Sequence, residues 1–321
     1  MIKKNITPIT DIIVRDKSRK KFNNHIVNDD INQLTDTQYS HSTVLAMTTD
    51  WNRFVSFCEA KHVNALPASI TAIRMFLEYE SRERKFASIR RYSITIGTIH
   101  KLHSYPVPTA HRQIQFTLSQ LRLQKQGDAR QANALTTKHL DSLDELLSRE
   151  NTLRGHRDRA IYYIMFECAL KRTNLKNLQL SDVVQIDNQW CVNLNDMTYK
   201  LSDKAGSALF DWIQFLTGSQ GYLFRRIDKH NNIGMYQLDD SSIYRILRRA
   251  SDLLGLANHY RFTGQSARVG ATQELERQGY NIRDIQDFGR WLSPAMPAQY
   301  LQMKRVAENE MTKYKVIKPW D

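Results

Sequence analysis

The first half of the chain places apolar residues at the three- and four-residue spacing of amphipathic helices. A first helix is expected over residues 40–62, a second from Pro67 onward, a third over the basic residues 82–103, and a fourth over residues 110–125. Together they predict a small all-helical domain. The apolar face of that first helix consists of Met47, Trp51, Phe54, Val55 and Cys58.

Two stretches flank this domain, which is expected to span residues 37–125. Residues 1–36 are polar, rich in Asn, Asp and Lys, and lack sustained periodicity, so a flexible N-terminal arm is expected. Residues 126–134 contain glycine and charges of both signs without apolar periodicity, which is typical of a linker between domains.

The second half mixes helix and strand patterns. A helix is expected after the capping residue Thr136, and the nearly all-apolar residues 157–170 are expected to be buried. Further helices are predicted at residues 208–216 and 241–254. These elements belong to a predicted C-terminal domain over residues 135–321.

One segment of the second half alternates as a strand does. Residues 189–194 carry aromatic and β-branched side chains, and residues 199–200 lie on the next strand or its turn. The predicted fold is therefore mainly α, with an N-terminal helical domain and a C-terminal α+β domain that contains a small β-sheet.

Composition adds a strong positive charge. Lys and Arg number 46 against 33 Asp and Glu, a net charge of +13. Such an excess attracts polyanions and makes their binding salt-dependent, which points to nucleic acid or an anionic membrane surface. No apolar run approaches the ~18 residues of a spanning helix, and the first residues lack the apolar core of a signal peptide, so no membrane association is expected.

The cysteines predict neither a disulfide framework nor a zinc site. Cys58, Cys168 and Cys191 are odd in number and widely spaced. A reducing cytoplasm is the simplest compartment for such a chain. Because Cys168 lies in an apolar run, we interpret it as a core residue.

Three residues suited to phosphodiester chemistry follow one another near the C-terminus. Arg268 opens a predicted helix, Trp291 follows a second short helix capped by Asn281, and Tyr300 comes one segment later. Arginine offers phosphate a fork of donors, an indole N–H donates one hydrogen bond, and a tyrosine oxygen can attack phosphorus. Each residue type alone is most often packing or surface, so the argument depends on their spacing.

The spacing resembles the tyrosine recombinase (phage integrase) family, most closely its Cre-like branch. Residues 264–271 read Gly-Gln-Ser-Ala-Arg-Val-Gly-Ala, against Gly-His-Ser-Ala-Arg-Val-Gly-Ala in the family, and residues 289–291 and 299–301 match its Gly-x-Trp and tyrosine elements. This resemblance implies a site-specific DNA recombinase of a mobile genetic element. Such enzymes cut and rejoin strands through a 3′-phosphotyrosine, without a metal or other cofactor.

The resemblance assigns roles to individual residues. Tyr300 is expected to be the nucleophile, with Arg268 and Trp291 as phosphate-binding groups. Residues 198–206 resemble the loop that carries the family's general acid, which is Lys200 or, as an open alternative, Lys204.

Two positions depart from the family pattern. Lys171 replaces the first family arginine, and lysine keeps the charge but lacks the two-pronged fork. Arg172 is one residue along, about 100° around a helix, and serves only if the backbone shifts. Gln265 replaces the usual histidine and cannot shuttle a proton near neutral pH. A catalytically degenerate DNA-binding or architectural factor therefore remains the alternative function. A type IB topoisomerase or a telomere resolvase is a further, less favoured alternative.

The resemblance also implies a mode of DNA binding. The helical domain is similar to a core-binding domain, and the two domains are expected to form a C-shaped clamp on double-stranded DNA with inverted-repeat sites. Two protomers are expected on each site and four in the synapse, with residues 306–314 forming a helix that docks on a neighbour. A solvated charged face would look like the predicted DNA-binding set, which is Arg82, Arg84, Lys85, Arg90, Arg91 and Lys101.

Overall fold

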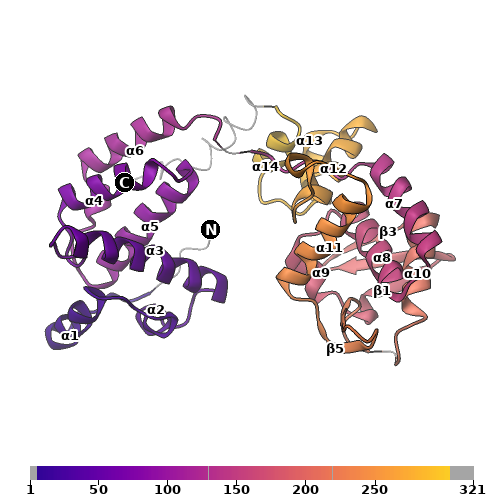
Figure 1. Cartoon of the computed structure of the whole chain (residues 1–321), viewed down its shortest axis with the longest axis horizontal. Coiled ribbons are helices and arrows are strands. Elements are labelled where there is room, and N and C mark those ends of the chain that lie inside the picture. Colours follow the sequence, from indigo (N-terminus) through magenta and orange to yellow (C-terminus); the bar gives the residue numbers. More distant parts are fainter. Residues whose placement is uncertain (1–5, 129, 219, 304–321) are drawn as a thin grey trace. The chain divides into compact units, whose positions relative to one another are not determined.

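The computed structural model describes residues 6–128, 130–218 and 220–303. The chain divides into two compact units, Met1–Arg130 and Gln131–Asp321 (Figure 1). No helix in the described ranges is long and apolar enough to cross a membrane. The predicted helix over residues 306–314 lies outside the described residues.

The first unit is all-helical. Its long helix α3 carries the predicted apolar face, and all five residues of that face are buried. Helix α4 begins after Ser69, whose hydroxyl accepts a hydrogen bond from the amide of Ala72 at 3.1 Å, and so begins later than Pro67. The helices are α1 (Ile12–Phe22), α2 (Asn28–Leu34), α3 (His41–Ala60), α4 (Ile70–Ser81), α5 (Phe86–Leu102) and α6 (Arg112–Gln124), with a 3-10 turn at Pro108–Ala110.

The prediction of a flexible N-terminal arm is wrong for residues 12–34, which form α1 and α2. Phe22, Ile31 and Leu34 are buried in the core of the first unit, and the indole of Trp51 donates to the carbonyl of Phe22 at 3.0 Å. The sequence pattern missed these helices because α1 has apolar residues only at its two ends and α2 is only seven residues long.

The basic helix starts later than predicted. Helix α5 begins at Phe86, so Arg82, Arg84 and Lys85 lie in the connection from α4 and not on the helix itself. Lys85 has extended backbone angles as the N-cap residue. The three residues therefore do not share one helical face with Arg90.

A buried histidine makes the first unit acid-labile. His100 is fully buried, its Nδ1–H donates to the carbonyl of Ile96 at 2.8 Å and its Nε2 accepts from the amide of Ala68 at 2.9 Å. Burial lowers the pKa of His100 to about 4. In the unfolded chain His100 takes up a proton below its ordinary pKa of about 6.5, whereas in the folded protein it stays neutral down to about pH 4.

We therefore expect the free energy of unfolding to fall by about 2 kcal/mol between pH 7 and pH 4.5, measured by urea denaturation. The neighbouring His103, whose pKa is also lowered by burial, acts in the same direction. His100→Gln should flatten the pH dependence, whereas the exposed control His111→Gln should keep it. Equal slopes in the two variants would contradict the assignment.

The second unit is built around a buried helix. Helix α8 is buried on nearly all sides, as predicted for residues 157–170, and is packed by α7, α10 and α12. Helix α7 begins after Thr136, whose hydroxyl accepts from the amide of His139 at 3.3 Å. The helices are α7 (Thr137–Glu150), α8 (Leu153–Glu167), α9 (Arg172–Asn177), α10 (Asp203–Ile213), α11 (Asp240–Leu253), α12 (Ser266–Arg277), α13 (Ile282–Phe288) and α14 (Ala295–Tyr300).

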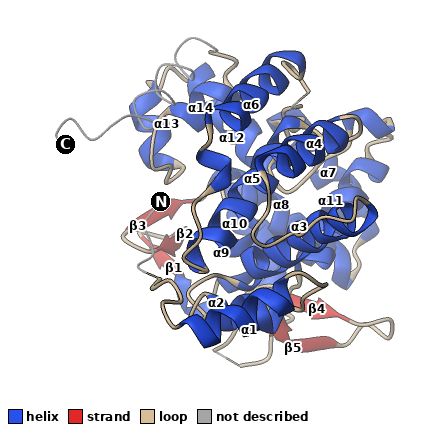
Figure 2. Ribbon diagram, turned by 90° about the vertical axis from the view of Figure 1, so that its left-hand side faces the viewer, coloured by secondary structure: helices blue, strands red, loops and turns tan. Residues whose placement is uncertain are grey.

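Within the described residues, two small sheets complete the second unit (Figure 2). Strands β1 (Val183–Ile186), β2 (Gln189–Leu194) and β3 (Met197–Lys200) form an antiparallel meander in that order. Strands β4 (Arg225–Ile227) and β5 (Ile233–Gln237) form a separate hairpin that is too short for its periodicity to be recognised in sequence. The fold is mainly α with small sheets, as the sequence predicted.

The boundary between the two units, after Arg130, falls within the predicted linker over residues 126–134, and the residues that follow it are packed. Gln131 and Asn133 donate hydrogen bonds to carbonyls within the second unit. Leu135 is fully buried, and its amide donates to the carbonyl of Ser266 at 3.0 Å. At Gly270 any side chain would overlap the Leu135 carbonyl, so this glycine lets α12 approach the backbone of residue 135.

Candidate active site

A cavity of about 300 Å³ in the second unit brings together most of the predicted site residues. They reach it from the start of α9, the first turn of α12, the loop after α13 and the end of α14, and α12, α13 and α14 lie together in Figure 1. The cavity is lined by Lys171, Gln265, Arg268, Arg290, Trp291, Leu292, Ser293, Met296 and Tyr300.

Arg268 is a fixed positive charge in the wall of this cavity. The residue is only 1% exposed, and its guanidinium donates to the carbonyls of Ala169 and Gly289. Its Cζ atom lies 4.1 Å from the ring centroid of Trp291. Burial lowers the pKa of Arg268 to about 10, so the side chain remains charged at neutral pH.

Tyr300 is held by three glutamines. Its hydroxyl donates to Oε1 of Gln265 at 3.2 Å, and its carbonyl accepts from Gln131 at 3.0 Å and Gln273 at 3.3 Å. Burial raises the pKa of the Tyr300 phenol, and the nearby Arg268 opposes that shift. The phenol is therefore protonated at neutral pH and is oriented within the cavity of its own chain.

Trp291 connects Arg268 to Tyr300. Its ring meets the Tyr300 ring edge-on, with centroids 6.0 Å apart. The indole lies against Gly289, where a side chain would overlap the ring, so this glycine is required for the indole to occupy the cavity wall. The stacked guanidinium and the two rings form one rigid surface.

Lys171, and not Arg172, lines the cavity. Lys171 is the N-cap residue of α9, whereas Arg172 is its first helical residue and packs against the backbone of Gly264. The pKa of Lys171 is lowered by burial and then by the charges of Arg268 and Arg290. The two adjacent side chains thus diverge, as expected for neighbours at the start of a helix.

Neither candidate for the general acid lines the cavity. Lys204 on α10 forms an ion pair with Asp141 at 2.6 Å. Lys200 is the exposed last residue of β3 and takes part in no ion pair among the described residues. Lys200 therefore stays the better candidate, with its role a prediction.

Among the described residues, two of the six predicted DNA-binding side chains are paired with carboxylates and four are in no ion pair. Arg91 donates two hydrogen bonds of 2.8 Å to the carboxylate of Asp50. Arg84 lies 3.8 Å from Glu80, which also binds Arg53 at 2.6 Å. In the described part of the chain no ion pair involves the other four, which are exposed: Arg82, Lys85, Arg90 and Lys101.

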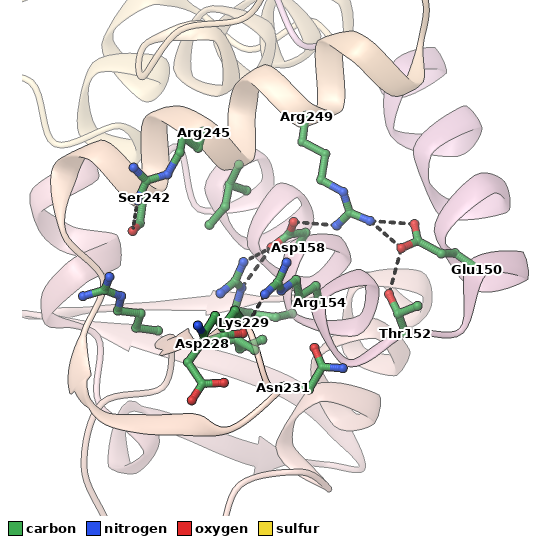
Figure 3. A pocket seen from close by; sticks show the side chains of 14 residues that line it. Glu150, Thr152, Arg154, Asp158, Asp228, Lys229, Asn231, Ser242, Arg245 and Arg249 are labelled. Carbon is green, nitrogen blue, oxygen red and sulfur yellow. Dashed lines mark hydrogen bonds and ion pairs between the residues drawn. The ribbon is translucent and has the colours of Figure 1, made fainter.

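A larger cavity of about 830 Å³ is lined by residues whose ion pairs hold helices of the second unit together (Figure 3). Between α8, α11 and the β4–β5 hairpin, Arg249 bridges Glu150 at 2.6 Å and Asp158 at 2.8 Å, and Arg157 binds the same Asp158. These ion pairs fix α11 to α8. None of the predicted site residues lines this cavity, and the described ranges contain no cluster of His, Cys, Asp and Glu that could hold a metal ion.

Several cavity residues were missed by the sequence analysis. Arg290, Leu292, Ser293 and Met296 line the cavity, but nothing in the sequence distinguishes them from surface residues. Their position follows from the turn after α13, where Arg290 has a left-handed backbone with a φ of 54°.

An arginine stacked on an indole beside an oriented phenol brings together groups that suit a phosphodiester. Residues 134–305 match the model of the phage integrase family, and since this match spans more than half of the chain, the protein belongs to that family.

Its relatives are distant in sequence. The chain is 22% identical to an integrase/recombinase XerD homolog of Selenomonas ruminantium, over 94% of this chain and 93% of that protein. It is 20% identical to the Cre recombinase of Escherichia phage P1, over 83% and 84% of the two chains.

Solved structures share the fold. The XerH site-specific recombinase in a post-cleavage complex has a TM-score of 0.62 at 11% identity, covering 95% of this chain and 90% of that chain. A lambda integrase dimer bound to a core site has a TM-score of 0.58 at 14% identity, covering 88% and 79%. At such identities these similarities support the architecture alone.

Proposed function

We propose that the protein is a site-specific DNA recombinase that cleaves and rejoins strands through a 3′-phosphotyrosine at Tyr300. The observation that carries the proposal is the cavity in which the Tyr300 hydroxyl, the Arg268 guanidinium and the Trp291 ring meet within one chain. Membership of the phage integrase family supports the same chemistry.

The cleavage step is a phosphoryl transfer. A bond forms between the Tyr300 oxygen and phosphorus, the bond from phosphorus to the 5′ oxygen breaks, the phenol proton leaves to water, and Lys200 protonates the departing oxygen. Arg268 and Lys171 stabilise the charge on the pentavalent intermediate. Attack by the 5′-hydroxyl of a second strand reverses the step and releases Tyr300.

The hydrogen bond from Tyr300 defines the role of Gln265. Its amide oxygen accepts a hydrogen bond from the Tyr300 hydroxyl at 3.2 Å and so orients that hydroxyl in the cavity. An amide cannot remove that proton near neutral pH, so Gln265 orients the nucleophile without acting as its base.

The substrate is double-stranded DNA with inverted-repeat sites, bound by a dimer on each site and a tetramer in the synapse. The XerH and lambda integrase structures, which share the fold, are complexes with DNA, the latter with a dimer. A protein with this substrate acts in the cytoplasm of a bacterium that carries the element. The net charge of +13 and the exposed residues Arg82, Lys85, Arg90 and Lys101 suit DNA phosphates.

The test is covalent capture of DNA from the source of the gene. Sheared genomic DNA is incubated with the protein, denatured with detergent, and precipitated with the attached protein before sequencing. The expected product blocks a 3′-exonuclease but accepts a 5′-phosphate from a kinase. Salt-sensitive, sequence-specific binding without any covalent product would support the degenerate DNA-binding alternative instead.

The lowered pKa of Lys171 predicts a pH effect. As pH rises, the cavity loses the Lys171 charge earlier than an ordinary lysine would be lost, so the rate of adduct formation should fall on the alkaline side. Lys171→Arg keeps its charge and adds a donor fork, so it should shift that fall to higher pH and raise the neutral rate about tenfold.

Single-turnover adduct formation from pH 6 to pH 10.5 measures both effects. Lys204→Arg is the matched control, because Lys204 lies outside the cavity and is paired with Asp141. The same alkaline limb in Lys171→Arg and wild type would exclude Lys171 as a group that stabilises the reacting phosphate.

A further inference from the structure

Arg290 is a third cation in the wall of the cavity. It lies with Lys171 and Arg268 among the lining residues, which include no carboxylate. Arg290 comes from the turn between α13 and α14, Lys171 from the start of α9 and Arg268 from α12, so the three charges lie on separate segments of the chain. Three cations around one small cavity suit an anion with several oxygens.

The guanidinium of Arg290 is held in place at one side only. It donates to the carbonyl of Cys168 at 3.0 Å and to the hydroxyl of Tyr199, and its Cζ lies 4.9 Å from the Tyr199 ring centroid. Tyr199 is itself fixed, because its hydroxyl donates to the carbonyl of Phe288 at 2.5 Å. A guanidinium has five N–H groups, so these two contacts leave donors for a ligand.

The charge of Arg290 is not neutralised by its neighbours. No ion pair involves Arg290 in the part of the chain that the structure describes, and burial raises the pKa of Tyr199, so this phenol stays neutral. Its charge also contributes to the lowered pKa values of Lys171 and Arg268. Like charges gathered without an acid oppose one another until an anion binds between them.

The backbone at Arg290 favours a different residue. Its φ of 54° lies in the left-handed region, which glycine adopts most readily. The turn is fixed by hydrogen bonds of 3.0 Å from the amide of Arg290 to the carbonyl of Asp287 and from the amide of Trp291 to the carbonyl of Gln286. Glycine can therefore replace Arg290 without disturbing the turn, which makes it a suitable substitution for testing the side chain.

We propose that Arg290 binds a non-bridging oxygen of the scissile phosphate and supplies the second guanidinium that Lys171 lacks. The inference rests on the proposed function and deepens it, because it names a further catalytic residue of that site. The pair Lys171 and Arg290 then provides the charge and the donor fork on two residues, with Arg268 on the other side of the phosphate.

Arg290→Gly is the decisive variant, because glycine fits the left-handed turn without strain. On a DNA site captured by the wild type, we expect single-turnover adduct formation to fall about 100-fold. The melting temperature should fall only modestly, because relief of the left-handed turn offsets part of the lost hydrogen bonds to Cys168 and Tyr199, and DNA binding should change less than about twofold. The control is Arg283→Ala, which removes an exposed arginine from α13, the helix before this turn, and should react as the wild type does.

A modified substrate separates phosphate contact from a structural role. A methylphosphonate at the scissile position removes the charge of one non-bridging oxygen. For the stereoisomer that lacks the contacted oxygen, the ratio of the wild-type rate to the Arg290→Gly rate should be at least about tenfold smaller than on ordinary DNA. Adding Lys171→Arg to Arg290→Gly should restore about tenfold of the rate on ordinary DNA, because a guanidinium returns to the cavity.

The outcomes distinguish this inference from the proposed function. Wild-type adduct formation together with an equally active Arg290→Gly overturns the inference and leaves the recombinase assignment standing. A deficit of the same size on both methylphosphonate isomers and on ordinary DNA overturns it as well, because Arg290 would then only hold Tyr199 and β3. A wild type that forms no adduct overturns both.

Discussion

Tyr300→Phe is expected to abolish covalent DNA capture while the protein still binds its DNA. The change deletes only the hydroxyl, so the rate of adduct formation should fall by at least about 10⁴-fold. The remaining ring keeps its edge-on contact with Trp291. Loss of the hydrogen bond to Gln265 should cost about 1 kcal/mol of folding free energy, since the phenylalanine fits the same volume.

The measurement is a denaturing gel of the adduct beside a binding assay at matched salt. Tyr280→Phe is the control, because Tyr280 is exposed and does not line the cavity. Tyr314 is a rival nucleophile that lies outside the described residues. Capture that survives Tyr300→Phe and disappears in Tyr314→Phe would reassign the nucleophile.

Arg268→Ala should damage catalysis and folding together. The buried guanidinium joins the carbonyl of Ala169, after α8, to the carbonyl of Gly289, after α13. Deleting it leaves two buried acceptors without partners at about 1 to 3 kcal/mol each, so the expected loss of stability is several kcal/mol. The reacting phosphate also loses its most rigidly held donor, which predicts a rate loss of about 10³-fold.

Arg268→Lys separates the two effects. Lysine keeps the charge but does not reach both carbonyls with a planar fork, so the rate should still fall about 100-fold in a protein that remains folded. Arg277→Ala is the control on the same helix, because the ion pair of Arg277 with Glu274 is exposed and screened by solvent. Calorimetry and adduct kinetics measure both properties, and an Arg268→Ala protein with the wild-type melting temperature would contradict the bridging role.

At the two positions that depart from the family pattern, the cavity keeps a hydrogen-bond acceptor and a positive charge. Gln265 still orients the Tyr300 hydroxyl, which requires only an acceptor. Lys171 still brings a charge to the cavity wall. What the two replacements remove is proton transfer at residue 265 and two-pronged donation at residue 171, and these losses are specific enough to be measured.

Features that depend on local chemistry could be predicted from the chain alone. The apolar face of α3, the cap at Thr136 and strand β2 could be predicted, because periodicity and capping act over a few residues. The spacing of Arg268, Trp291 and Tyr300 also predicted that these side chains meet, since short elements joined by tight turns leave little freedom between them.

Which of two neighbouring side chains faces the cavity depends on tertiary packing. Lys171 and Arg172 are adjacent, and the packing of α9 against Gly264 turns one toward Arg268 and the other away. Arg290 reaches the same cavity through a left-handed turn and a contact with Tyr199, ninety-one positions away in sequence. Side-chain direction at helix ends and turns depends on such long-range contacts, which no local pattern encodes.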